Sequence, residues 1–332
     1  MTIEIIAELA QGFEGNPSQA KLLMKAAAYS GANAAKYQMV FADELATPDY
    51  KYFALFKSLE MADDVWHGLA SYAKELNIQL QLDIFGTKSL SLAEQVGAYA
   101  IKLHGTDIAN IGLLNEVASS GIGKVLLGAG GAYLDELEQA LSILSNKEVV
   151  ILVGFQGYPT ANQDNQISRI TLLIQHFSNK YPNVSVGFAD HALPESTLRY
   201  ALASVAIGAG ATVLEKHLTL GKVMQLEDHE SALNPDEFLE FTNTIKDCAR
   251  ALGASVLTEN FGMTDSEQRY RKMIRRHVVA SSDITSGTQL STSHLSLKRT
   301  SSETVFTDLS LVYHKKLKRE VKMNTAISPE DI

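Results

Sequence analysis

The sequence predicts an α/β fold, namely a (β/α)8 TIM barrel followed by a small C-terminal domain. Eight short runs of β-branched and aliphatic residues alternate with amphipathic segments of helical periodicity. These strand candidates are apolar almost throughout, which is typical of parallel strands that are covered on both faces. The alternation extends over about 250 residues, the usual size of such a barrel, and the pattern changes in kind after Gly253.

The expected strands and helices occur in regular order along the chain. The strand candidates are Ile3–Leu9, Ala34–Met39, Ile78–Ile84, Ala100–Leu103, Lys124–Leu127, Val149–Val153, Val184–Phe188 and Thr212–Glu215. The amphipathic segments between them include Ser18–Tyr29, Asp64–Leu76, Leu137–Leu144, Ile167–Phe177 and Glu195–Ile207. The helix that closes the eighth unit begins with Asn234 as its N-cap and Pro235 in its first turn, and it reaches Gly253.

The C-terminal part of the chain has a different organisation. The barrel domain is expected over residues 1–253, a linker over residues 254–272 and a separate small domain over residues 273–332. Residues 283–295 align with residues 320–332 at a constant offset of 37, so that Gly287 coincides with Asn324. Glycine and asparagine most readily adopt positive φ. We therefore expect two related halves, each a turn followed by a short capped helical turn.

The composition predicts a folded protein with a large apolar core. Of the 332 residues, 45% are hydrophobic and 20% are charged, which excludes a disordered chain. The net charge of −9 argues against a nucleic-acid partner, since such a surface needs clustered Lys and Arg. Residues 1–4 carry an acid where a signal peptide carries basic residues, and Gly208 and Gly210 interrupt the longest uncharged stretch. We therefore expect a cytoplasmic protein with no membrane partner.

Polar residues follow the strand candidates unusually often. In a barrel of this kind the carboxyl ends of the strands carry the active site, so these residues are the candidates for chemistry. They include Glu8, Lys36, Gln38, Asp83, Lys102, His104, Gln156, Tyr158, Asp190, His191, Glu215 and His217. Strand alternation places Lys36 on the same face as Gln38. Two inward lysines with carboxylates nearby favour an anionic substrate.

Two histidines suggest a metal site. His191 and His217 close adjacent strands, and two imidazoles leave open positions for water, a carboxylate or a substrate. This donor set suits Mn, Zn, Fe or Co, although each histidine alone also fits an ordinary polar role at a loop mouth. Lys102 suits either an anion or a Schiff base. The loop 128–131, of sequence GAGG, fits either a phosphate cradle before a helix or a plain strand-to-helix turn.

Six short segments carry motifs that can be compared with known families. They are Ile5–Glu8, Gly31–Gln38, Tyr158–Thr160, Asp190–His191, Gly210–Leu220 and Asp228–Leu233. These motifs resemble the sialic acid synthase family, and residues 277–280, 298–299 and 316–320 resemble the antifreeze-like (SAF) domain that follows its barrel. The likeness covers nearly the whole chain. It implies a transferase that condenses phosphoenolpyruvate with N-acetylmannosamine or a related aldose, forming a nonulosonic acid and releasing phosphate.

The resemblance also implies roles for individual residues. Two glutamates would manage protons and orient the attacking water, and two histidines would bind a divalent metal, typically manganese, with Mg, Co, Zn or Fe as alternatives. One arginine would come from the partner subunit of a domain-swapped homodimer. The residues so assigned are Glu8 and Glu215 for catalysis, Lys36, Lys102 and Gln156 for phosphoenolpyruvate, Gln38, Tyr158, Asp228 and the partner-reaching Arg299 for the sugar, and His191 and His217 for the metal.

The sequence departs from this family around the phosphoenolpyruvate pocket. Gly105, Gly128 and Ala189 stand where family members usually carry serine. Each lost hydrogen bond to a charged group is worth about 1.5–3 kcal/mol, so the pocket cannot be reused unchanged. Gln156 and backbone N–H groups could compensate. The alternatives are a family member that uses another enol or pyruvate donor and a non-catalytic sugar-binding protein; which sugar is the acceptor, and whether it is phosphorylated, stays open.

Overall fold

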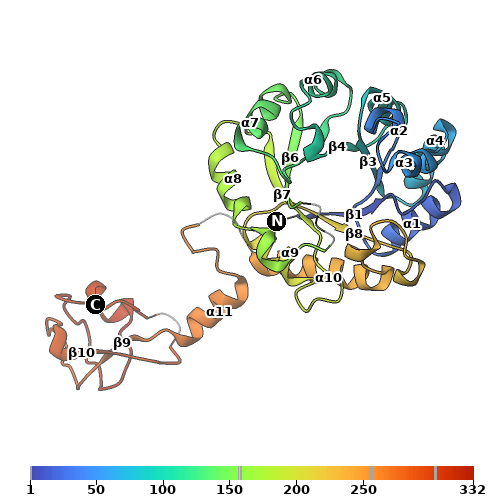
Figure 1. Ribbon diagram of the computed structural model, residues 1–332. Coiled ribbons are helices and arrows are strands. Elements are labelled where there is room, and N and C mark those ends of the chain that lie inside the picture. The colour runs from blue at the N-terminus through green and yellow to red at the C-terminus, as the bar shows by residue number, and fades with distance from the viewer. Residues whose placement is uncertain (1, 156, 158, 254–257, 303–304) are drawn as a thin grey trace. The chain divides into compact units, whose positions relative to one another are not determined.

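The computed structural model describes residues 2–155, 157, 159–253, 258–302 and 305–332. The chain divides into two compact units, Met1–Gly253 and Ala254–Ile332, and each has its own apolar core. Figure 1 looks along the axis of the first unit, where a ring of helices surrounds the strands. Within the described ranges, no helix has both the length and the apolar character that crossing a bilayer requires.

The first unit is a closed barrel of eight parallel strands in chain order, which confirms the predicted fold class. The strands are β1 (Glu4–Ala10), β2 (Ala34–Gln38), β3 (Gln79–Ile84), β4 (Ala100–Leu103), β5 (Lys124–Gly128), β6 (Glu148–Val153), β7 (Val184–Asp190) and β8 (Val213–His217). The helices are α1 (Pro17–Tyr29), α2 (Ala42–Leu45), α3 (Phe53–Leu59), α4 (Asp63–Glu75), α5 (Thr87–Gln95), α6 (Ile111–Ser119), α7 (Leu134–Ile143), α8 (Arg169–Phe177), α9 (Ala201–Gly208) and α10 (Pro235–Leu252).

The chemistry of the barrel interior changes along its axis. In the middle, an apolar layer includes Ile6, Leu126 and Val150. At the amino ends of the strands, Glu4 accepts hydrogen bonds from the Gln81 amide (2.8 Å) and from a lysine of β5 (2.6 Å). Further charged side chains enter the barrel at the carboxyl ends of the strands, where β1, β2, β3, β4 and β8 supply them.

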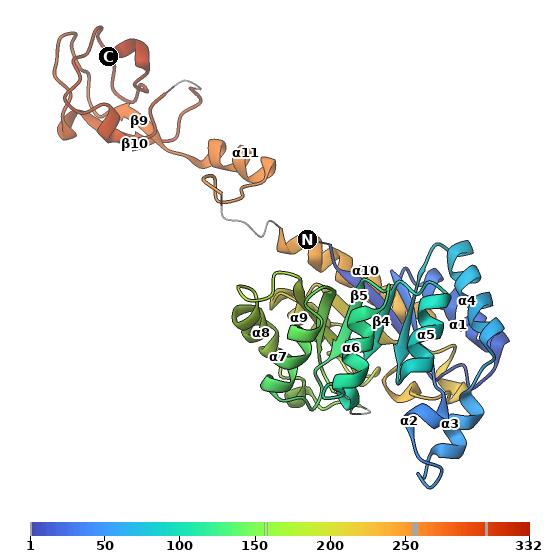
Figure 2. The ribbon, with the colours of Figure 1, turned by 90° about the horizontal axis from the view of Figure 1, so that it is seen from above.

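Two parts of the first unit differ from the sequence-based expectation. The predicted helix Glu195–Ile207 begins only at Ala201, because the preceding residues form turns in which the Tyr200 hydroxyl donates to the Glu237 carbonyl of α10 (3.0 Å). The short helices α2 and α3 were not expected, since neither has the length or the side-chain cap that reveals a helix in a sequence. Figure 2 shows α2 and α3 together at one end of the barrel.

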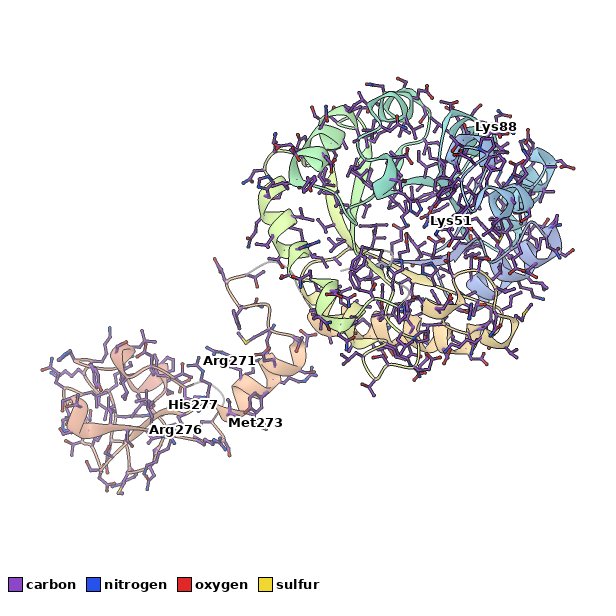
Figure 3. All side chains as sticks on the ribbon, in the orientation of Figure 1. Lys51, Lys88, Arg271, Met273, Arg276 and His277 are labelled. Atoms are coloured by element: carbon purple, nitrogen blue, oxygen red, sulfur yellow. The ribbon has the colours of Figure 1, made fainter. Side chains whose placement is uncertain are left out.

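The second unit contains α11 (Asp265–Ile274) and the antiparallel strands β9 (His277–Ala280) and β10 (Leu295–Lys298). Most of helix α11 falls in the segment 254–272 that was predicted as a linker, and the sequence analysis did not expect a helix there. Thr264 caps this helix. None of the helix residues is buried, so the sequence has no apolar stripe from which the helix could be predicted. Its Arg271 and Met273 side chains are exposed (Figure 3).

The predicted internal repeat is confirmed within this unit. Gly287 has φ +83° and Asn324 has φ +64°, so both turns adopt the left-handed region. Each turn is followed by a capped 3-10 helix, Thr292–His294 in one half and Pro329–Asp331 in the other. The two halves also pair through reciprocal backbone hydrogen bonds between Ile284 and Val321. The apolar core of the unit therefore joins both halves.

Candidate active site

The register of the strands brings charged residues to one level of the barrel. Glu8 pairs in register with Lys36 of β2 on one side and with His217 of β8 on the other. Asp83 of β3 likewise pairs with Lys102 of β4. A bulge follows Glu8, and it turns a backbone N–H back so that it donates to Glu8 Oε1 (2.8 Å). The carboxylate of Glu8 is thereby fixed at the carboxyl end of the barrel.

Two lysines and three carboxylates form a buried charged cluster at this level. Lys36 Nζ contacts Glu8 Oε2 and lies 2.5 Å from Asp83 Oδ1 and 3.5 Å from Glu215 Oε2. Lys102 Nζ donates to Glu215 Oε1 at 2.6 Å and lies 3.8–3.9 Å from the other two carboxylates. None of the five side chains is more than 8% exposed. The cluster therefore acts as one electrostatic unit.

The cluster holds one more carboxylate than lysines, so it favours an extra proton. Burial, and then Asp83 and Glu215, raise the pKa of Glu8 to about 8, although Lys36 and Lys102 oppose the shift. Burial also acts on the other two carboxylates, but there the lysines outweigh it and hold the pKa of each below its usual value. Glu8 is therefore the member that carries a proton near neutral pH, and the other two stay ionised.

His191 and His217 lie beside this cluster at the ends of β7 and β8. Their ring centroids are 5.1 Å apart, and both residues are 4% exposed. Burial lowers the pKa of His191 to about 4, and burial and the neighbouring His191 lower that of His217 well below its usual value. Both rings are therefore neutral at physiological pH, the form that binds metals. His217 Nε2 also lies 4.0 Å from Asp228 Oδ2.

A second buried ion pair holds the turn that carries His191. Lys216, whose side chain is fully buried, lies 3.2 Å from Asp190 Oδ1 and donates to the Ala192 carbonyl at 3.1 Å. The same carboxylate accepts from the Ala192 N–H at 2.8 Å. Residues on both sides of His191 are thus anchored to β8. In the described part of the chain, no group of three or more His, Cys, Asp or Glu side chains could by itself hold a metal ion.

A glycine-rich cavity of about 350 Å³ opens over Lys102, His104 and His191. Its wall is built from the loops after β4 to β7, which touch through their backbones. A Cβ atom on Gly105 would lie 2.3 Å from the Gly130 carbonyl oxygen, and one on Gly130 would lie 2.6 Å from the Gly154 oxygen. Neither position can accept a side chain without movement of a loop. Gly105, which stands at one of the three serine positions described above, is thus required by the packing of the loops. The wall presents backbone peptide groups to the cavity.

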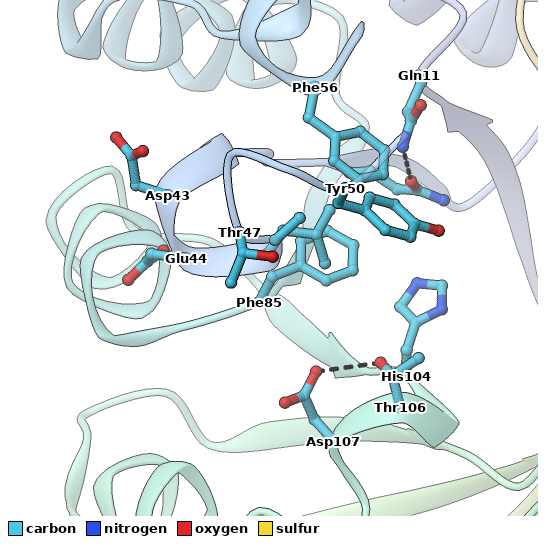
Figure 4. Close-up of a pocket in the computed structure, with 13 residues that line it drawn as sticks. Gln11, Asp43, Glu44, Thr47, Tyr50, Phe56, Phe85, His104, Thr106 and Asp107 are labelled. Carbon is cyan, nitrogen blue, oxygen red and sulfur yellow. Dashed lines mark hydrogen bonds between the residues drawn. The ribbon is translucent and has the colours of Figure 1, made fainter. Parts of the chain in front are cut away.

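A larger cavity of about 800 Å³ adjoins the first, because His104 and Thr106 line both. Figure 4 shows aromatic rings on one side of it and carboxylates at its rim. Gln11 donates to Gln38 Oε1 at 2.7 Å inside this cavity. Tyr50 stacks on Phe56 with 6.0 Å between ring centroids, and both rings come from the α2–α3 region. A ligand in this cavity can therefore contact the faces of aromatic rings as well as polar groups.

The structure brings six of the predicted site residues together: Glu8, Lys36, Lys102, His191, Glu215 and His217. Gln38 lines the larger cavity, and Asp228 lies beside His217. Arg299 is an exposed residue of the second unit, next to the end of β10, while Gln156 and Tyr158 lie outside the described residues.

Asp83 and His104 belong to the site, although neither the sequence pattern nor the family resemblance gives them a role. Asp83 Oδ2 lies 2.6 Å from His104 Nε2, and its other oxygen binds Lys36. Both were visible in the sequence as polar residues at the ends of adjacent strands. His104 also follows Lys102 by two positions, which is the spacing of side chains on one face of a strand. The signal was present, but only the fold shows that these two side chains meet.

Comparison with known proteins is consistent with this site. A model of the NeuB family matches residues 23–256. An uncharacterized protein of Methanocaldococcus jannaschii is 30% identical over 99% of this chain and 94% of its own length. The N,N'-diacetyllegionaminic acid synthase of Legionella pneumophila is 26% identical over the whole of this chain and 95% of its own. The crystal structure of the N-acetylneuraminic acid synthetase of Leptospira borgpetersenii, in complex with citrate, is 26% identical and superposes with a TM-score of 0.73 over 82% of this chain and 93% of that one. The chain is therefore an enzyme of the NeuB family.

Proposed function

We propose that this enzyme condenses phosphoenolpyruvate with an N-acylated aldose, such as N-acetylmannosamine, to a nonulosonic acid with release of phosphate. The observation that carries the proposal is the buried cluster of two lysines and three carboxylates beside two neutral imidazoles. Such a site can hold an anionic donor and move protons, for which a non-catalytic sugar-binding protein has little use. The names of two relatives, a synthase of Legionella and a synthetase of Leptospira, support this reaction class.

His191 and His217 hold a divalent metal in this proposal, with manganese favoured and Mg, Co, Zn or Fe as alternatives. The residues fit such a group, because both rings are neutral, buried and 5.1 Å apart, and the Asp228 carboxylate lies near. Bound there, the ion would supply a Lewis acid that polarises the aldehyde oxygen of the open-chain sugar. Two protein ligands leave coordination positions for water and substrate.

The other residues of the cluster bind the donor and move protons. The ammonium groups of Lys36 and Lys102 hold the carboxylate and phosphate of the donor. Carbon 3 of the enol attacks the aldehyde carbon, and a carbon–carbon bond forms. Glu8, which carries a proton near neutral pH, donates it to the oxygen that becomes the new hydroxyl. Glu215, held ionised against Lys102, stabilises the positive charge that develops at carbon 2.

One observation favours a second candidate, a family member that uses another enol or pyruvate donor. The cavity beside Lys102 lacks the three serine hydroxyls, and the loop packing at Gly105 leaves no space for a side chain. A phosphate there would bind to backbone N–H groups and to Gln156 instead. A donor without phosphate would not need these contacts.

The acceptor end of the site involves Gln38, Tyr158, Asp228 and Arg299 in this proposal. Gln38 is held by Gln11 in the larger cavity, which supports a role in orienting a hydroxylated ligand. Arg299 would act from a C-terminal unit of SAF type, supplied by the partner subunit of a domain-swapped homodimer. This assignment rests on the family resemblance of the motif Lys298-Arg299.

A phosphate-release assay tests the proposal. Phosphoenolpyruvate, Mn²⁺ and a panel of acylated hexosamines, free and 6-phosphorylated, are incubated with the wild-type protein and with His191→Ala. We expect metal-dependent release with one sugar and its loss in the variant. No release with any sugar, from a protein that does bind metal, contradicts the proposal; product formed from pyruvate instead supports the second candidate.

A further inference from the structure

The larger cavity is suited to the part of the acceptor sugar that does not react. Its volume of about 800 Å³ lies in the range of small-molecule sites. It adjoins the glycine-rich cavity beside Lys102, because Thr106 lines both. Gln38, which follows Lys36 by two positions on the same face of β2, lines it as well. A sugar that reacts beside the charged cluster can therefore extend its remaining carbons into this cavity.

The wall of this cavity carries carboxylates without a matching cation. Asp43, Glu44 and Asp107 line it, and among the residues that the structure describes no lysine or arginine does so. The positions outside the described ranges contain no lysine or arginine in the sequence. Aromatic rings, including those of Tyr50 and Phe56, form much of the remaining wall. An anionic substituent in the cavity would therefore face like charge and apolar surface.

The lysines close to this wall in the sequence are engaged outside the cavity. Lys51 Nζ lies 4.4 Å from the centre of the Tyr52 ring, and Lys88 Nζ lies 3.7 Å from the centre of a phenylalanine ring. Lys57 Nζ lies 3.5 Å from Asp43 Oδ2, and both of these side chains are exposed. The charge of Asp43 is thus partly neutralised. The negative potential of the cavity therefore comes mainly from Glu44 and from the carboxylate after β4.

Glu44 fills a position that would otherwise suit a phosphate group. The backbone N–H groups of Lys88 and Ser89, in the first turn of α5, donate to its two carboxylate oxygens at 2.5 and 3.1 Å. The Ser89 hydroxyl donates to the same carboxylate at 2.9 Å. Gly86 makes room for it, since a Cβ atom there would lie 2.5 Å from Glu44 Oε1. The N–H groups that attract anions at a helix N-terminus are thus already occupied by a side chain of the protein.

Asp107 is held on another part of the wall. Its two oxygens accept from the Thr106 hydroxyl and from the Asn110 amide, each at 3.1 Å (Figure 4). The stacked rings of Tyr50 and Phe56 offer faces that suit C–H and acyl groups of a sugar. The cavity thus combines two fixed carboxylates with apolar surface, which favours an uncharged ligand.

We propose that the acceptor is an uncharged N-acylated aldose without a phosphate group, and that Glu44 determines this specificity. The inference rests on the proposed function. A phosphate monoester carries a charge of about −1.5 to −2 at pH 7. In this cavity it would face Glu44 and Asp107, and it would find the N–H groups of α5 occupied. Like charge that rejects a competing ligand is a general route to specificity.

Two sugars that differ only in the phosphate, N-acetylmannosamine and its 6-phosphate, test the inference by kinetics. We expect the wild-type kcat/KM to favour the free sugar by about 10²-fold or more. Glu44→Gln keeps an oxygen that can accept from the N–H groups but loses the charge, so this ratio should fall by about tenfold, through KM for the phosphorylated sugar. The matched control is Glu94→Gln, which makes the same exchange in α5 at a carboxylate that accepts from the Gly121 N–H outside the cavity. It should leave the ratio unchanged.

Calorimetry of the same two sugars measures binding without turnover, so it separates this inference from the proposed function. The 6-phosphate should bind Glu44→Ala, in which the N–H groups of α5 are vacant, at least about tenfold more tightly than it binds the wild-type protein. Asp107→Asn should shift binding in the same direction, and it serves as the second variant if Glu44→Ala does not fold.

A wild-type protein that uses or binds the 6-phosphate as well as the free sugar overturns the inference. The absence of any gain in binding of the 6-phosphate by these variants overturns it as well. If no sugar reacts but the variants show the expected gain, the proposed function fails and the role of Glu44 in excluding phosphate stands.

Discussion

Replacing Glu8 by glutamine is expected to remove a pH dependence from the stability of the barrel. The pKa of Glu8 is about 8 in the folded protein against 4.5 for an ordinary glutamate. Between these values the folded state holds a proton that the unfolded chain releases. The free energy of unfolding of the wild-type protein must therefore fall as pH rises through this window, and the fall ends above pH 8. Glu8→Gln keeps an oxygen that can accept from the backbone but has no proton to lose.

The structure sets an upper limit on the size of this effect. Each unit of pKa difference corresponds to about 1.4 kcal/mol, so the window from 4.5 to about 8 corresponds to at most about 5 kcal/mol. Lys36 contacts Glu8 and Asp83, so the titration of Glu8 is coupled to the rest of the cluster, and this coupling makes the effect smaller than the limit. We expect the variant to gain roughly 2–4 kcal/mol relative to wild type between pH 5 and pH 8.5.

Urea unfolding followed by circular dichroism at several pH values measures this difference. The transition of the barrel is compared between wild type, Glu8→Gln and a matched control, Glu75→Gln, at the exposed end of α4. The control should run parallel to wild type. A stability difference between Glu8→Gln and wild type that stays constant from pH 5 to pH 8.5 would refute the reasoning, because Glu8 would then be ionised throughout.

Three further perturbations follow from the geometry of the site. Gly105→Ser is expected to lower stability by about 1–3 kcal/mol in urea unfolding, because its Cβ would approach the Gly130 oxygen to 2.3 Å; an unchanged midpoint with tighter phosphoenolpyruvate binding would contradict the account of the loop packing. Lys216→Met should cost about 3–5 kcal/mol by leaving Asp190 buried without its cation, and a variant as stable as wild type would show that this pair is dispensable. His217→Ala is expected to abolish metal binding at the barrel mouth, which metal analysis after dialysis against Mn²⁺ measures; unchanged metal content would exclude the two-histidine site.

The barrel was predictable because its signal is local. Apolar strands that alternate with amphipathic helices indicate a sheet that is covered on both faces. The same pattern places the ends of the strands to within a few residues. Helix α11 was not predicted because a fully exposed helix has no apolar face in its sequence. Helix α9 was predicted too long, because contacts with α10 hold the residues before it in turns. The internal repeat was visible for the same local reason, since positive φ selects glycine at position 287 and asparagine at position 324.

The residues at the barrel mouth could be read from the sequence alone, because side chains alternate along a strand and strand ends converge in a closed barrel. The chemical role of each of these residues depends instead on its contacts in the folded barrel. Lys102 donates a hydrogen bond to Glu215, which lies 113 positions away in the sequence. His104, just after β4, is hydrogen-bonded to Asp83 of the neighbouring strand β3. Which carboxylate keeps a proton and which imidazole stays neutral depends on burial and on distances between strands. Electrostatic energies vary steeply with both, and no local pattern in the sequence records them.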